Sequence, residues 1–316
     1  MTDPSVSMVV EWANVRAGGE RRARVALEAL SREIAGASGV VEVFVMHDPA
    51  ASPISAEQLV ESSPLADNPN AKIEVVDASG LDYYDLKNAG FQKSSGEIVI
   101  FCDSDSMLEP NWLREITAPF ADPEVGLVAG ATYVAIEGGV VNRYFALNWL
   151  FDLRSGDDPV RPTTRFKANN VAFRHATAEA YPFPKDLRFR GRCRSLAAIL
   201  AADGVKMVQN PRARVGHGYP DGPAVFARRA ICAGHDRVIE DRRRERPRVL
   251  LRAARRYQRE LSRDVRRTLK SYRDVGATRT QVPAMLAIAF TYSSFALLGS
   301  LMSAVAPEFV RRNFAM

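Results

Sequence analysis

The sequence has little cysteine and little histidine, and this scarcity excludes several classes of protein. Its 316 residues include 3 cysteines, and Cys102, Cys193 and Cys232 lie far apart in the chain. An odd and sparse set of cysteines excludes a disulfide framework and a cysteine-rich metal site, so we expect a reducing compartment. The first apolar run, residues 6–10, is too short for the core of a signal peptide.

Excess positive charge is missing from most of the chain. The net charge is +6, yet residues 242–279 alone hold 15 Lys and Arg against 4 Asp and Glu, which is +11. The remainder therefore carries −5, which argues against a nucleic-acid-binding surface on the main domain. The basic segment has only Tyr257 and Tyr272 to stack on bases. We therefore expect no nucleic-acid partner.

Hydrophobic patterning predicts an α/β fold. Apolar runs typical of strands and periodic stretches typical of helices alternate along the chain. Strands are predicted at 6–10, 40–46, 71–76, 97–102 and 125–134, and helices at 21–35, 84–94 and 110–120. This alternation indicates a doubly wound, mostly parallel sheet flanked by helices, and nearly continuous apolar runs suit strands covered on both faces.

Polar side chains follow three of these predicted strands, at 11–14, 47–48 and 103–105. Because ligands bind beyond the carboxyl ends of parallel strands, we expect these clusters to meet at one edge of the sheet. Asp103 and Asp105 would place two hard oxygen ligands there, which suits Mg²⁺ or Mn²⁺ bridging a diphosphate. The alternative is a turn whose aspartate caps the next helix. The strand before the motif and the helix start after it favour the metal site.

Three blocks of sequence resemble the inverting family 2 glycosyltransferases, which have the GT-A fold. The first runs from Lys87-Asn88-Ala89-Gly90 through the strand at 97–102 into Asp103-Ser104-Asp105. The others are 166–174, with its central Asn, and 210–217, which ends in Val215-Gly216-His217. The resemblance implies a GT-A domain over residues 1–237 that takes a nucleotide-sugar as donor.

The resemblance also implies binding residues for the donor. Asp48 would hold the nucleobase, Glu11 would lie in the loop that contacts base and ribose, and Lys87 would face the base or the phosphates. Without the resemblance, Asp48 is equally a turn residue before a proline, and Glu11 is a solvated loop acid. Lys87 would then be an exposed helix lysine. Neither the base nor the sugar is encoded in a motif, although UDP or GDP is expected.

The metal site is implied in the same way. Asp103 would contact ribose or metal, Asp105 would bind the metal directly, and His217 would complete the site as a third ligand. A Mg²⁺ or Mn²⁺ ion is the expected cofactor. A purely structural role for His217 stays open at this point, because a buried histidine is as common as a ligand histidine.

The sequence departs from the family where the catalytic base is expected. The family has an acidic pair there, and this chain has Arg192 and Cys193. Arginine is permanently protonated and cannot act as a base, and a buried cysteine usually serves as a small apolar residue. Asp186 is the nearest acid and is the candidate base. The surrounding basic residues suggest an anionic acceptor or a solvated basic face. They are Arg188, Arg190, Arg192 and Arg194.

The C-terminal part has a different character. Residues 238–280 are predicted to form an arginine-rich helical segment, and 281–316 an apolar helix with a short tail. The stretch 282–306 carries no charge and is long enough to cross a bilayer. Arginines before it suit the cytosolic side of the membrane. A buried or dimer-forming helix is the alternative.

Together these features predict a metal-dependent, hexosyltransferase-like enzyme. Its resemblance to the family implies inversion at the anomeric centre. It would act on a lipid-linked or polysaccharide acceptor at the cytosolic face of the cell membrane, in polysaccharide biosynthesis. Two alternatives stay open. The lost acidic pair suits a degenerate GT-A protein that binds without turnover. A nucleotidyltransferase is the other, although no Gly-rich basic fingerprint stands near the N-terminus.

Overall fold

The computed structural model describes residues 4–50, 54–154, 156–185 and 188–314. The chain forms two compact units. The first, called the sheet unit, comprises Met1–Tyr133, Arg154–Lys185 and Arg192–Gly218. The second, called the helical unit, comprises Val134–Leu153, Asp186–Gly191 and Tyr219–Met316. Each is described by itself, and the three-domain division at 1–237, 238–280 and 281–316 stays a prediction.

The described residues of the sheet unit contain a nine-stranded sheet of order β3-β2-β1-β4-β8-β6-β9-β5, with β7 paired to β9. Its parallel part is β3-β2-β1-β4, and β8 joins β4 in antiparallel sense. The strands are β1 (Val6–Glu11), β2 (Val41–His47), β3 (Ala71–Asp77), β4 (Ile98–Asp103), β5 (Ser106–Leu108), β6 (Val125–Val134), β7 (Arg161–Pro162), β8 (Asn170–Arg174) and β9 (Lys206–His217). The predicted strands are found within one residue of their expected bounds.

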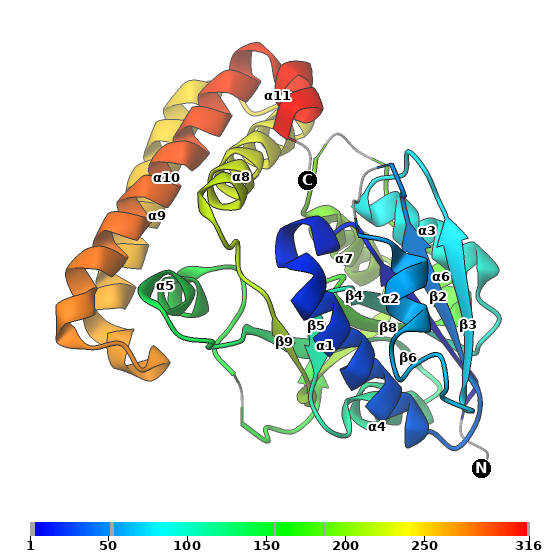
Figure 1. Ribbon diagram of the computed structural model, residues 1–316. Coiled ribbons are helices and arrows are strands. Elements are labelled where there is room, and N and C mark those ends of the chain that lie inside the picture. The colour runs from blue at the N-terminus through cyan, green and yellow to red at the C-terminus, as the bar shows by residue number, and fades with distance from the viewer. Residues whose placement is uncertain (1–3, 51–53, 155, 186–187, 315–316) are drawn as a thin grey trace. The chain divides into compact units, whose positions relative to one another are not determined.

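Helices cover both faces of this sheet (Figure 1). They are α1 (Val15–Ala35), α2 (Ala56–Glu61), α3 (Tyr83–Lys93), α4 (Trp112–Thr117), α6 (His175–Ala180) and α7 (Arg192–Ala202), with a 3₁₀ turn η1 (Ala118–Ala121) after α4. Residues alternate along β1, so that Met8 and Val10 join the core under α1 while Val9 joins the core under α3. The predicted α/β fold with a sheet flanked by helices is confirmed. The sheet is mixed rather than mostly parallel, because the pairings made by β8, β7 and β5 are antiparallel.

Two predicted helices differ in their bounds. The helix expected to begin at residue 21 begins at Val15, and Gly19 interrupts it with a positive φ of 76°. Glycine tolerates this conformation because it has no Cβ. The helix expected to run to residue 120 ends at Thr117, and Pro119 lies in the 3₁₀ turn that follows. Proline cannot donate to the preceding turn, so it stops the α-helix there.

The helical unit is built around α10. Its elements are α5 (Val140–Asn148), α8 (Pro223–Arg243), α9 (Val249–Ser271), η2 (Tyr272–Val275), η3 (Arg279–Gln281), α10 (Val282–Val305) and α11 (Pro307–Phe314). Both predicted C-terminal helical segments are therefore present. In the part of the chain that the structure describes, one helix, Arg279–Val305, is long enough and apolar enough to cross a membrane. In its most apolar stretch, 33% of the residues are buried.

Two glycines set the close approach of α8 and α10. A Cβ placed on Gly234 would lie 2.0 Å from the carbonyl oxygen of Ala296, and one on Gly299 would lie 2.2 Å from that of Ile231. Both obstacles are backbone atoms within helices, so they cannot rotate away. The two helices can therefore keep this distance only with glycine at both positions.

Gly299→Ala should lower the free energy of unfolding by about 1–3 kcal/mol, because the added methyl group forces α8 and α10 apart. The sign is informative, since alanine in place of glycine ordinarily stabilises a helix by about 1 kcal/mol. Urea denaturation followed by circular dichroism measures the change. Gly39→Ala is the control, because its Cβ would meet nothing within 4 Å. Equal or higher stability of the Gly299 variant would contradict the close contact.

Candidate functional site

The site lies where β1, β4 and β9 end in the sheet unit. Glu11, the last residue of β1, stands in register with Asp103, the last residue of β4. The chain then turns through Ser104 and Asp105 into β5, whose first residue pairs with His217 at the end of β9. Parallel pairing on one side and antiparallel pairing on the other therefore bring residues distant in sequence to the same edge.

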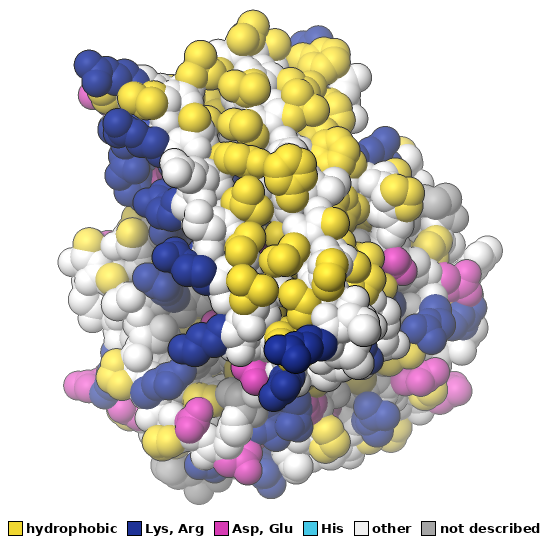
Figure 2. All heavy atoms as spheres, turned by 90° about the vertical axis from the view of Figure 1, so that its left-hand side faces the viewer, with side chains coloured by type: hydrophobic (Ala, Val, Ile, Leu, Met, Phe, Trp, Pro, Cys, Tyr) yellow, Lys and Arg dark blue, Asp and Glu magenta, His cyan; other side chains and the backbone are white. Residues whose placement is uncertain are grey.

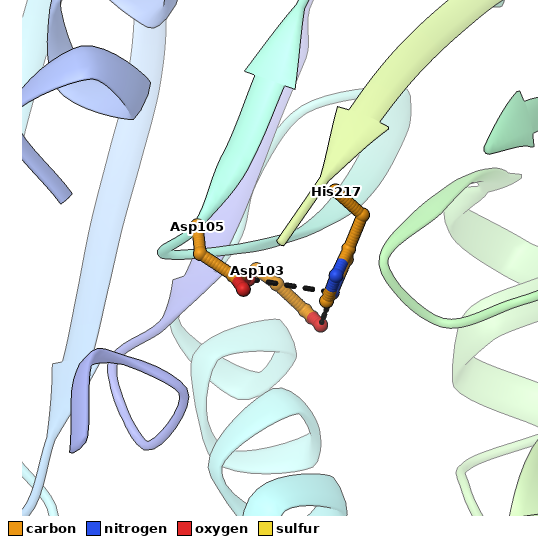
Figure 3. A group of neighbouring side chains, drawn as sticks. All are labelled: Asp103, Asp105 and His217. Atoms are coloured by element: carbon orange, nitrogen blue, oxygen red, sulfur yellow. Dashed lines mark ion pairs between the residues drawn. The ribbon is translucent and has the colours of Figure 1, made fainter. Parts of the chain in front are cut away.

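Asp103, Asp105 and His217 form a compact group with the chemistry of a metal site. One ligand atom from each lies within 4.8 Å of the others, and all three side chains are buried. His217 Nε2 is 3.5 Å from Asp103 Oδ2 and 3.3 Å from Asp105 Oδ1. Figure 3 shows the imidazole and the two carboxylates turned toward one another. Two carboxylates and an imidazole are a donor set that fits Mn²⁺ or a similar divalent cation.

The environment of His217 suits a ligand role. Its Nδ1 lies 2.7 Å from the carbonyl oxygen of Gly218. A carbonyl only accepts, so Nδ1 carries a proton and donates it, which leaves Nε2 of the neutral ring available to a metal. Burial alone would lower the pKa of His217, but the carboxylates of Asp105 and Asp103 outweigh it and raise that pKa. A cation bound between the carboxylates would oppose this effect.

Asp103 is held by hydrogen bonds from three directions. Its Oδ1 accepts from Lys87 Nζ at 2.9 Å and from the Tyr83 hydroxyl at 2.8 Å. Its Oδ2 accepts from Asn14 Nδ2 at 2.6 Å. Lys87 is 0% exposed and also donates to the carbonyl of Cys102 at 2.8 Å. The alternative of an exposed helix lysine is therefore wrong, whereas a role for Lys87 at the donor stays a prediction.

Arg22 is a second cation at this site, and the sequence analysis did not single it out. The side chain is buried on α1. A Cβ placed on Gly218 would lie 2.7 Å from Arg22 Nη1 and 3.1 Å from Asp105 Oδ2, so the guanidinium lies beside the Asp105 carboxylate. Gly18 also lies close to Asp105, because a Cβ placed on Gly18 would be 3.2 Å from the Asp105 Cβ. Glycine at 18 and 218 leaves room for these two side chains to lie side by side.

The other residues that were predicted to contact the nucleotide-sugar also lie at strand ends. Glu11 is fully buried, and its Oε2 accepts from the backbone N–H of Ala13 at 2.9 Å. It is therefore not the solvated loop acid considered as an alternative. Asp48 accepts from the N–H groups of Ala50 and Gly80, at 2.9 and 3.0 Å. It braces the loops that follow β2 and β3, and contact with a nucleobase stays a prediction for both acids.

Where the family has its acidic catalytic base, this chain has an internal ion pair. Arg192 is buried at the start of α7, where it contacts Asp82 and lies 3.5 Å from Asp85. Its guanidinium stacks over the ring of Tyr84, with 5.2 Å from Cζ to the centroid. Cys193 Sγ lies 3.1 Å from the hydroxyl of the same tyrosine. Both residues thus tie α7 to α3, and Asp186 lies outside the described residues.

The arginine cluster does not act as one basic face. Arg188 is buried within the helical unit and pairs with Glu240 at 2.7 Å, just as Arg192 pairs with acids of α3 in the sheet unit. A buried arginine needs such a counter-charge because unpaired charge is costly to desolvate. The hypothesis that all four arginines bind an anionic acceptor or form a solvated face is therefore wrong for these two.

Comparisons with known proteins agree with this geometry. Residues 25–184, half of the chain, match the family model described as glycosyl transferase family 2. A search of curated proteins found no match.

Solved structures of similar fold include two complexes with sugar nucleotides. The mannosyltransferase PcManGT from Pyrobaculum calidifontis, in complex with GDP-Man and Mn²⁺, has a TM-score of 0.51 at 15% identity, covering 98% of this chain and 76% of its own. TarS 1-349 from S. aureus, in complex with UDP-GlcNAc, has a TM-score of 0.51 at 12% identity, covering 95% and 91%. At such identity these structures show the fold alone. With the family match over half of the chain, from before β2 to beyond β8 and including the Asp103-Ser104-Asp105 turn, the chain belongs to glycosyl transferase family 2 and has the GT-A fold.

Proposed function

We propose that this glycosyltransferase moves a sugar from a nucleotide-sugar donor to an acceptor hydroxyl, with a divalent metal held by Asp103, Asp105 and His217. The observation that carries the proposal is the buried group of three ligand atoms within 4.8 Å at the carboxyl ends of the strands. When bound, the metal would neutralise charge on the diphosphate leaving group. Mg²⁺ or Mn²⁺ fits this donor set.

The surrounding residues of this chain would prepare the site for a diphosphate. Lys87 pairs with Asp103 and Arg22 lies beside Asp105, so these cations offset part of the negative charge of the group before a metal binds. A divalent cation then makes it positive, which attracts an anionic donor. Tyr83 and Asn14 fix the orientation of Asp103, and this costs no reorganisation when the donor arrives. UDP- and GDP-sugars are the expected donors, as in the two solved complexes.

For the acceptor we propose a lipid-linked or polysaccharide chain at the cytosolic face of the membrane. The uncharged α10 and the basic α9 before it support this location. Inversion at the anomeric carbon is proposed from the family alone. A base for the acceptor hydroxyl is needed in such a transfer. Asp186 remains the candidate from the sequence.

A second function is a protein of this fold that binds a nucleotide-sugar without turning it over. It is favoured by one observation, the buried Arg192 that stands where the family has an acid and is committed to Asp82 and Asp85. The two functions differ in turnover and agree on donor binding. Binding is therefore the property to measure first.

Thermal stabilisation by a panel of nucleoside diphosphates, with and without Mn²⁺, tests the donor site. One nucleotide should stabilise the protein only with metal, by about 2.7 kcal/mol at a hundredfold excess over its dissociation constant. His217→Gln should weaken this response strongly, because it removes the nitrogen ligand. His175→Gln is the control, since that histidine instead contacts the carbonyl of Gly96. If no nucleotide stabilises the protein with any metal, the proposed donor site is overturned.

A further inference from the structure

The sizes of the side chains on α10 are reversed relative to a helix in a water-soluble core. Its buried positions are mostly small, namely Met285, Ala289, Ser293, Ala296, Gly299, Ser300 and Ser303. Large apolar side chains point outward instead: Phe290 is 57%, Leu298 43% and Val305 86% exposed. Small residues at helix contacts with large ones facing outward are typical of helices packed together in lipid.

Neighbouring helices extend this apolar surface. Leu250, Leu251 and Leu269 of α9 and Phe309 of α11 are also exposed. Figure 2 shows the hydrophobic side chains of these helices as one continuous surface rather than as scattered residues. A surface of this kind marks an interaction site, because monomeric soluble proteins rarely expose large contiguous apolar patches.

A basic stripe borders the apolar surface. Exposed basic residues recur every three or four positions along α9, which places them on one side of that helix. They are Arg255, Arg259, Arg263, Arg266 and Lys270. Of the two acids of α9, Asp264 pairs with Arg263 of the stripe at 2.8 Å, whereas Glu260 pairs with Arg237 of α8 at 2.7 Å. The acids of α9 therefore offset one of the five charges of the stripe. Figure 2 shows Lys and Arg side chains in a row along one edge of the apolar surface.

This pairing of surfaces fits an anionic lipid bilayer. Apolar side chains favour the boundary between headgroups and acyl chains, while a row of arginines beside them favours anionic headgroups. A second copy of the chain would have to bring the same basic stripe against itself or pair it with acids. Charge complementarity therefore selects lipid as the occupant.

The packing of α10 also decides how it meets the membrane. It lies alongside α9 and is locked to α8 through Gly234 and Gly299 (Figure 1). If α10 crossed the bilayer in this packing, the arginines of α9 would be carried to the depth of the hydrocarbon. Charged side chains are strongly disfavoured there. Crossing would thus require the helical unit to come apart.

We propose that the helical unit binds anionic membranes in plane: α10 lies along the interface, its outward face enters the acyl boundary, and the basic stripe of α9 contacts the headgroups. The proposal rests on the membrane location given under the proposed function, and is independent of the sugar chemistry. It assigns to α10 a role other than crossing the bilayer.

Co-sedimentation of the full chain with vesicles tests the surface. Binding should be stronger to phosphatidylcholine vesicles containing phosphatidylglycerol than to phosphatidylcholine alone, and should weaken with salt. Leu298→Asp with Leu301→Asp should reduce binding at least about tenfold, since charge is placed in the acyl boundary. Val40→Asp is the control, because that valine is also an exposed apolar residue but lies in the sheet unit.

Reversing the stripe tests its part separately. Arg255→Glu with Arg259→Glu should remove the preference for anionic vesicles, at least about tenfold in affinity, and Lys72→Glu on the sheet unit should not. Circular dichroism shows whether each variant keeps its helices. A chain that binds neither kind of vesicle, and is instead a dimer that Leu298→Asp with Leu301→Asp makes monomeric, would overturn the proposal in favour of a self-interface.

Depth measurements separate the in-plane helix from a crossing one. Phe290→Trp, Leu298→Trp and Val305→Trp, each measured against the wild type, report depth through quenching by brominated lipids. An in-plane helix puts all three at a similar depth. A crossing helix would separate positions 290 and 305 by about 22 Å along its axis. If the three tryptophans lie at successively greater depths, the in-plane arrangement is overturned and the membrane location still stands. Nucleotide stabilisation tests the donor site independently of the membrane location and of the orientation of α10.

Discussion

Asp105→Asn should reduce sugar transfer by at least about a thousandfold and leave the fold intact. Asp105 Oδ1 lies 3.3 Å from His217 Nε2, and the carboxylate is buried. Asparagine keeps the shape but loses the charge that a divalent metal requires. A metal that neutralises the leaving group supplies several kcal/mol, and each 1.36 kcal/mol corresponds to a factor of about ten in rate.

The rate to measure is release of nucleoside diphosphate from the sugar nucleotide whose base the stabilisation panel identifies, across a titration of Mn²⁺. Asp122→Asn is the matched control, because Asp122 also lies in the sheet unit but pairs with Lys206 at an exposed position. Its turnover should equal that of the wild type. Retained turnover in Asp105→Asn with an unchanged metal response would remove Asp105 from the metal site.

The wild type itself decides between the two proposed functions. If it binds a nucleoside diphosphate with metal yet releases none from any sugar nucleotide, the protein binds without turnover, as the buried Arg192 suggests. If the wild type does release nucleoside diphosphate from a sugar nucleotide, a catalytic base exists elsewhere in the chain. Asp186→Asn then tests the candidate that the sequence offers, and undiminished turnover would eliminate it.

The parallel strands and the edge at which they end were predictable because of how they are buried. β1, β2 and β4 are nearly continuous apolar runs, each followed at once by polar residues. A strand covered on both faces by helices needs that pattern, and parallel pairing then places the strand ends together. Glu11 and Asp103 meet for this reason. The antiparallel half of the sheet was less visible, since its shorter strands, such as β5 and β7, carry no such run.

The partners of the aspartates could not be predicted in the same way. Tyr83 resembles any core aromatic at a helix start, and only tertiary packing turns its hydroxyl toward Asp103. Arg22 lies in a charged run with Arg21 and Arg24, and the rotation of α1 after the interruption at Gly19 decides which of them is buried. Arg192 looked like part of a basic face because its acids, Asp82 and Asp85, are more than a hundred positions away.

Lys87→Met should lower the free energy of unfolding by about 3–5 kcal/mol, because removing one partner of a buried ion pair leaves the other charge uncompensated. Lys87 is fully buried, with Nζ 2.9 Å from Asp103 Oδ1 and 4.8 Å from the centre of the Tyr83 ring. Methionine fills a similar space and cannot donate to either oxygen that Lys87 contacts. Asp103 would keep its hydrogen bonds from Tyr83 and Asn14, which stabilise the carboxylate only in part.

Urea denaturation of Lys87→Met, Asp103→Asn and the double variant measures the coupling between the two charges. The double variant should lose less stability than the two single variants together, since neither charge is then left alone. Lys93→Met is the control on the same helix, where an exposed pair with Glu74 contributes at most about 1 kcal/mol. If Lys87→Met behaved like this control and instead weakened only nucleotide binding, Lys87 would serve the donor rather than hold Asp103. Additive losses would likewise break the link between the two residues, and the orientation of Asp103 would then rest on Tyr83 and Asn14.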